Sequence, residues 1–143
     1  MLAPSRAGKT EFAKSLFRRP LVLGVGDLEH FPEGMRCFKK GYHDGVVLDD
    51  LRDLRFLVNH QEKVQGKYNA LVEFGSTPGG KCAYFRDLFC TPVVATANFS
   101  TKGLDLLEQD DFLGHSHNRV LLHWPPTDAQ PETDRATGPL TYL

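Results

Sequence analysis

The first residues constrain this chain more than any other stretch, because a short loop runs directly into helical sequence. Residues 3–10 are APSRAGKT, and residues 11–17 continue with apolar side chains at helical spacing. A phosphate-binding loop turns its backbone N–H groups around the anion, and the following helix points its N-terminus at the same anion. In Gly8-Lys9-Thr10, the lysine offers a charge to the β- and γ-phosphates and the hydroxyl offers an oxygen to Mg²⁺. The stretch therefore predicts a phosphate-binding loop followed by its helix.

One position departs from the usual form of such a loop, in which another glycine precedes Gly8 by five residues. Ala3 stands there, and alanine is tolerated only if the position does not need a positive φ. The alternative interpretation is a targeting peptide, because the first 20 residues carry five basic side chains and one acidic one. Such a peptide predicts none of the elements that follow, which favours the loop.

The composition is that of an ordinary globular domain. The chain has 143 residues, of which 41% are hydrophobic and 24% charged, with a net charge of −1. This charge restricts any nucleic-acid contact to a local patch. The three cysteines, Cys37, Cys82 and Cys90, lack the spacing of a zinc site, and no stretch reaches the ~20 apolar residues of a membrane span. We expect a soluble intracellular protein with reduced thiols, with the nucleus as one compartment open to it.

Three continuous apolar runs predict strands of a sheet that is buried on both faces. They cover residues 21–25, 45–50 and 92–98. Strands that alternate with helices indicate an α/β layer fold. The clearest helix is expected at residues 51–65, since Leu51, Leu54, Leu57 and Val58 share one helical face.

Polar side chains end two of these runs. Asp49 and Asp50 end the second run, and Asn98 ends the third. Asp50 alone is explained as a helix cap and Asn98 as a turn residue. Together with the upstream loop, the pattern favours Asp49 as a Mg²⁺ ligand beside Thr10 and Asp50 as the residue that polarises the attacking water.

A β-hairpin is predicted further along the chain, where residues 71–74 and 81–85 flank a glycine-rich turn. Lysines and aromatic residues near it are typical of a single-strand nucleic-acid contact, although an ordinary solvated hairpin has the same composition. Residues 118–124 predict a last strand with Arg119 at its start, and the polar, proline-bearing residues 126–143 predict a disordered tail.

In this order the elements resemble the core of a superfamily 3 helicase. The chain is most similar to the helicase domain of the replication initiator (Rep) proteins of circular single-stranded DNA viruses and their cellular relatives. Residues 4–10 correspond to Walker A, 46–50 to Walker B, 65–81 to motif B′ and 93–98 to motif C. The resemblance covers roughly residues 3–125.

This resemblance implies a P-loop NTPase domain of the AAA-like kind over residues 1–125, with three layers, a mostly parallel sheet and an inserted β-hairpin. It implies an ATPase that uses ATP and Mg²⁺ to translocate on single-stranded DNA, with RNA left open, as part of a hexameric ring. The residues implied to contact the nucleotide are Pro4, Ser5, Arg6, Ala7, Gly8, Lys9, Thr10 and Glu11. The implied catalytic residues are Lys9, Asp50, Asn98 and, as an arginine finger offered in trans, Arg119. Thr10 and Asp49 would hold the metal, and Lys67 and Lys81 would contact nucleic acid.

The family has a hydrophobic strand directly before the loop, where this chain has only Met1-Leu2. We therefore expect the first core strand to be missing, with exposed ladder edges beside the gap. The chain would then be a fragment or truncated descendant of a Rep-like helicase. One alternative is a remnant that binds nucleotide or nucleic acid without turnover. Another is a small-molecule kinase, which explains the loop and the two acids but leaves the hairpin, Asn98 and Arg119 without a role.

Overall fold

The fold is an α/β arrangement built on a parallel sheet of four strands. A computed structural model describes residues 1–24, 28, 30–61, 63, 71–75, 83–118 and 120. The sheet has the order β1-β6-β3-β2, with all neighbours parallel. Its strands are β1 (Leu2–Ala3), β2 (Pro20–Leu23), β3 (Gly45–Asp53) and β6 (Val93–Lys102). Two further strands, β4 (Leu71–Phe74) and β5 (Tyr84–Asp87), form an antiparallel pair.

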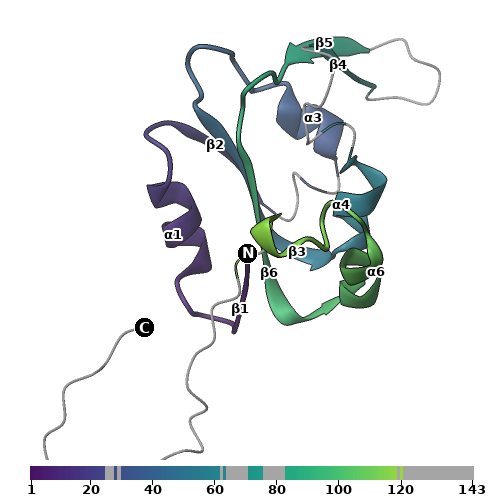
Figure 1. Ribbon diagram of the computed structural model, residues 1–143. Helices are drawn as coiled ribbons and strands as arrows, with labels where there is room; N and C mark the ends of the chain where they lie inside the picture. The colour runs from purple at the N-terminus through teal and green to yellow at the C-terminus, as the bar shows by residue number, and fades with distance from the viewer. Residues whose placement is uncertain are drawn as a thin grey trace, which may run out of the picture.

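Short helices cover both faces of the sheet. The helix α1 (Lys9–Ser15) lies on one face, whereas α4 (Arg55–Asn59) and α6 (Leu104–Gln109) lie on the other (Figure 1). A further helix, α3 (Phe31–Met35), lies beside the hairpin, and a 3₁₀ turn spans Ser116–Asn118. Because the sheet is covered on both sides, Val46, Val47 and Leu48 of β3 are buried. This burial explains why their run in the sequence is continuous.

The expectation that the first core strand is missing is wrong, because a short strand precedes the loop. Leu2 and Ala3 form β1 and pair with Ala97 and Asn98 of β6. The Ala97 N–H donates to the Met1 carbonyl at 3.0 Å, and the Leu2 N–H donates to Val120 O at 2.9 Å on the other side. Two residues are too few for a periodicity, so their pairing with β6 comes from tertiary structure. The edge of β6 is therefore paired at this point.

The helix expected at residues 51–65 is also wrong over its first part. Residues 51–53 continue β3, and α4 covers only Arg55–Asn59. Leu51 pairs with Ala97, and the Leu54 N–H donates to the Lys102 carbonyl of β6. A leucine spacing of three residues suits one face of a helix, but the long neighbouring strand supplies hydrogen-bond partners that keep the backbone extended. Residues 64–70 lie outside the described residues.

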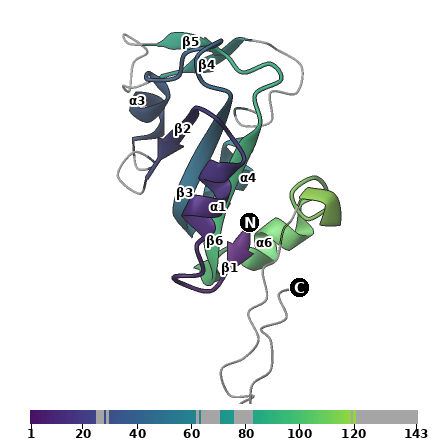
Figure 2. The same cartoon turned by 90° about the vertical axis from the view of Figure 1, so that its left-hand side faces the viewer.

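The first strand of the predicted hairpin is confirmed, whereas the second covers Tyr84–Asp87 and not the predicted residues 81–85. The hairpin lies at the opposite end of the sheet from the loop after β1 (Figure 2). Its tip at residues 76–82 lies outside the described residues. The same holds for most of the predicted last strand and for the predicted tail at 126–143. Within the described part, no helix is both long enough and apolar enough to cross a membrane.

Candidate functional site

Three parallel strands bring the predicted site residues together, although β3 continues past Asp49 and Asp50 to Asp53 and β6 continues past Asn98 to Lys102, so neither strand ends where the sequence predicted. Ala3, at the end of β1, pairs with Asn98 of β6, and β6 in turn pairs with β3, which carries Asp49 and Asp50. The chain leaves β1 through residues 4–8 and enters α1 at Lys9. Because the strands run parallel, their register places these residues of β3 and β6 beside the point where β1 ends and the loop begins.

The loop between β1 and α1 contains two residues in the left-handed region. Gly8 has φ 75°, which glycine adopts without strain, and Arg6 has φ 61°. Ala3 lies in β1 and has no positive φ, so the condition for an alanine there is met. The first helical bond runs from the Phe12 N–H to Gly8 O at 2.9 Å.

Lys9 is the buried cation of this site. Its side chain is 8% exposed, and its ammonium donates to Pro4 O at 2.9 Å and to Asn98 Oδ1 at 2.7 Å. Both acceptors are neutral, and within the described ranges no ion pair joins Lys9 to a carboxylate. A buried charge without a counter-charge is costly. The position is therefore suited to an anion.

Asp49 accepts two hydroxyl hydrogen bonds at one oxygen. Thr10 Oγ1 and Thr96 Oγ1 each donate to Asp49 Oδ1 at 2.8 Å. A hydroxyl that donates its proton keeps its oxygen lone pairs for another partner. Thr10 and Asp49 thus place a hydroxyl oxygen and a carboxylate side by side, which are ligands of the kind that Mg²⁺ takes.

Asp50 lies at an irregularity of β3. Leu48 pairs with Ala95 and Leu51 with Ala97, so two residues of β3 stand opposite one residue of β6. Asp50 has φ 56° and its side chain is exposed, while its N–H donates to Thr96 Oγ1 at 3.0 Å. The bulge turns this carboxylate out of the sheet toward solvent at the same end as the loop.

The other predicted residues have simpler surroundings. Ser5, Arg6 and Gly8 are exposed, and Pro4 and Ala7 are half-buried. Glu11 is exposed and forms an ion pair with Lys14 at 3.0 Å along the helix. Arg119, Lys67 and Lys81 lie outside the described residues, as does Cys82. Cys37 and Cys90 are free and exposed.

The described part of the hairpin presents two different faces. On one, two guanidinium groups lie over the Tyr84 ring, that of Arg36 at 5.0 Å and that of Arg86 at 4.5 Å from its centroid. Desolvation raises the pKa of Tyr84, with Arg86 and Arg36 opposing that change, and its hydroxyl donates to Pro32 O. The other face carries the exposed residues Leu71, Glu73 and Phe85. The guanidinium groups of Arg36 and Arg86 thus lie against an aromatic ring, and the outer face of the hairpin combines apolar and acidic side chains.

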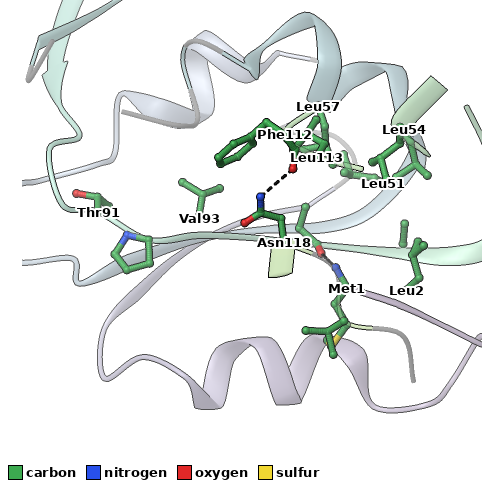
Figure 3. Close-up of a pocket in the computed structure, with 15 residues that line it drawn as sticks. Met1, Leu2, Leu51, Leu54, Leu57, Thr91, Val93, Phe112, Leu113 and Asn118 are labelled. Atoms are coloured by element: carbon green, nitrogen blue, oxygen red, sulfur yellow. Dashed lines mark hydrogen bonds between the residues drawn. The ribbon is translucent and has the colours of Figure 1, made fainter. Parts of the chain in front are cut away.

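An apolar cavity of about 300 Å³ lies apart from the loop. Figure 3 shows side chains that line it, including Leu51, Leu54 and Leu57, with Asn118 Nδ2 donating to Phe112 O at 2.7 Å. None of the residues that converge at the loop lines this cavity. In the described ranges, no three His, Cys, Asp or Glu side chains gather into a metal-binding group.

Thr96 is the residue of this site that the sequence interpretation missed. It stands two positions before Asn98, and alternate residues of a strand share a face. A hydroxyl inside an otherwise apolar run, on the same strand face as the amide that ends the run, was the available signal.

Compared with known protein families and with curated proteins, the chain matches no family model and no curated protein.

Proposed function

We propose that the carboxyl end of the sheet binds the phosphates of a nucleoside triphosphate with Mg²⁺. We further propose that the chain is the ATPase core of a Rep-like helicase acting on single-stranded DNA. The observation that carries the proposal is the buried Lys9 ammonium, whose bonded acceptors are neutral oxygens. A phosphate oxygen would supply the missing counter-charge through a charge-assisted hydrogen bond.

The neighbouring side chains support the same ligand. Thr10 and Asp49 offer a hydroxyl and a carboxylate, and Mg²⁺ is usually held by one or two carboxylates together with substrate phosphates. When bound, the metal neutralises charge that develops on the phosphates. Asp50, exposed at the same end, would orient and polarise the attacking water, and Asn98 would move from Lys9 to the γ-phosphate or the water.

The helicase part of the proposal rests on the order of the motifs along the chain. The parallel sheet, the loop after its first strand and the hairpin are compatible with the P-loop NTPase fold of that family. Arg119 would act as an arginine finger toward a neighbouring subunit of a ring, and Lys67 and Lys81 would contact DNA. A remnant that binds nucleotide without turnover is the alternative outcome of the experiment below.

The test measures binding of a fluorescent ATP analogue and ATP hydrolysis, with and without single-stranded DNA or RNA. Lys9→Ala should weaken nucleotide binding about 10- to 100-fold, as expected for a lost hydrogen bond to a charged group. Lys14→Ala is the matched control, because Lys14 lies on the same helix but is paired with Glu11 at its surface. Hydrolysis that rises with DNA and disappears in Asp50→Asn supports the helicase core.

Three results would change the conclusion. Binding that is equal in the wild type, Lys9→Ala and Lys14→Ala would overturn the phosphate site. Lys9-dependent binding without hydrolysis would favour the remnant. Phosphoryl transfer to a small acceptor in the absence of nucleic acid would favour a kinase.

A further inference from the structure

We infer that Thr96 is a positioning residue that holds Asp49 and Asp50 in the arrangement needed for metal-dependent nucleotide binding. The inference rests on the proposed function and adds a residue to it. Thr96 is fully buried in β6. Its hydroxyl donates a hydrogen bond to the carboxylate of Asp49 and accepts one from the backbone N–H of Asp50.

The first contact orients the carboxylate of Asp49. The Thr96 hydroxyl donates to Asp49 Oδ1 at 2.8 Å, and Thr10 donates to the same oxygen at the same distance. With two donors on Oδ1, the carboxylate is held in one rotamer, and within the described residues Oδ2 has no hydrogen-bond partner. That oxygen is then the one available to a cation or to a water bound to it.

The second contact holds the backbone of Asp50. Its N–H stands at the bulge and donates to Thr96 Oγ1 at 3.0 Å, where a regular ladder would use a carbonyl of β6. Asp50 has φ 56°, a conformation that side-chain-bearing residues rarely adopt and that persists only when the surroundings hold it. The hydroxyl of Thr96 replaces the missing ladder acceptor at that residue.

A purely structural role for Thr96 makes a different prediction. If the Thr96 hydroxyl formed its hydrogen bonds only to avoid being buried without partners, its removal would lower the stability of the fold and leave the metal dependence of nucleotide binding unchanged. The two partners found here are both acids proposed to serve the same reaction. Substitution should therefore change the metal dependence separately from stability.

The experiment compares Thr96→Val, which keeps the shape and removes the hydroxyl, with Thr96→Ser, which keeps the hydroxyl. Thr91→Val is the matched control, because Thr91 precedes the same strand at its other end and contacts Lys40. The first readout is the Mg²⁺ concentration that half-saturates the tightening of ATP-analogue binding. It should rise about 10-fold in Thr96→Val, as expected for one lost hydrogen bond to a charged group, and stay close to wild type in Thr96→Ser and Thr91→Val. Binding measured with a metal chelator should be the same in all four proteins.

The second readout needs no nucleotide. The amide of Asp50, followed by ¹⁵N NMR and hydrogen exchange, should exchange faster in Thr96→Val and remain protected in Thr96→Ser. If Thr96→Val does not fold, as judged by circular dichroism, Thr96→Ala provides both measurements.

The outcomes separate the two proposals. Equal Mg²⁺ dependence in the wild type and Thr96→Val, or an unchanged Asp50 amide, overturns the role of Thr96 and leaves the phosphate site standing. A wild-type protein that binds no nucleotide overturns the proposed function and, with it, this role of Thr96.

Discussion

The two ends of the parallel sheet carry polar residues in different ways. At the carboxyl end, Lys9, Thr10, Asp49, Thr96 and Asn98 come from three parts of the chain and bond to one another. At the other end, Arg86 of the hairpin lies over the Tyr84 ring and donates to Arg36 O, so that its contacts are with neighbouring residues of the hairpin and α3 region. The first arrangement buries a lysine ammonium among neutral oxygens. In the second, Arg86 also bonds to neutral carbonyls and, among the described residues, its buried Nε has no hydrogen-bond partner, but its guanidinium lies over the Tyr84 ring.

This difference shows what topology contributes. The register of parallel neighbours places residues of separate strands side by side, so side chains of β1, β3 and β6 meet whatever their distance in the sequence. A two-stranded hairpin decides only which side chains share its own two faces. Changes at the carboxyl end should therefore affect ligand binding more than stability, and changes at the hairpin end should do the reverse.

The largest effect is expected for Asp49→Asn. The amide oxygen can still accept hydrogen bonds from Thr10 and Thr96, so the free energy of unfolding should change little. The negative charge is lost, and the Mg²⁺-dependent part of nucleotide affinity should fall about 100-fold. Isothermal titration with and without Mg²⁺ measures it. Glu73→Gln, an exposed acid of the hairpin, is the control, and equal losses in the two variants would contradict the comparison.

Gly45→Ala should destabilise the fold without weakening nucleotide binding. Gly45 begins β3 at the end of the strand away from the loop, and a Cβ there would lie 2.2 Å from Phe17 Cε1. The ring must move, which should cost about 1–3 kcal/mol in the free energy of unfolding, measured by urea denaturation. Gly75→Ala is the control, because its Cβ would meet no atom within 4 Å. A loss of ATP affinity in Gly45→Ala would show that the two ends are coupled.

Arg86→Met should destabilise the hairpin end by about 1–2 kcal/mol, through the lost cation–π contact and hydrogen bonds. The apolar stem of methionine preserves part of the packing. Nucleotide affinity should remain at the wild-type value, since Arg86 makes no contact with the loop residues in the described structure. Weaker single-stranded DNA binding at unchanged stability would instead assign this arginine to the nucleic-acid surface.

The smallest effect concerns acid stability. Partial desolvation acts to raise the pKa of Asp44, but the N–H groups of Arg18 and Arg19, which donate at 2.7 and 2.9 Å, outweigh it. The pKa therefore lies below its ordinary value of 3.8. A lowered pKa means that the stabilisation is present above the ordinary value and is lost as the pH falls through the lowered one. Unfolding between pH 5 and pH 2 should depend less on pH in Asp44→Asn; equal slopes would contradict this assignment.

Much of the site was predictable because its signals are local. Gly8-Lys9-Thr10 is contiguous, and the two acids and Asn98 each end a continuous apolar run. The helix at 51–65 was predicted wrongly because leucines three residues apart do not distinguish a helix from a strand that later turns into one. Pairing with β6 keeps residues 51–53 extended as part of β3.

Other features had almost no local signal. Leu2-Ala3 is too short to show a pattern, and only its pairing with Ala97 and Asn98 of β6 makes it part of the sheet. The left-handed conformation of Arg6 stands at a residue type that gives no warning of it, and aspartate at position 50 tolerates that conformation without specifying it. Thr96 looked like an ordinary strand threonine until its two partners were known.

By itself, the sequence determined the loop, the alternation of helices and buried strands, and the hairpin, because each depends on neighbouring residues and their spacing. Only the tertiary structure decided that Leu2 and Ala3 complete the sheet, that β3 bulges at Asp50 and that Thr96 joins the two acids. Those features depend on hydrogen bonds between residues about 50 to 100 positions apart, which side-chain periodicity within one segment does not record.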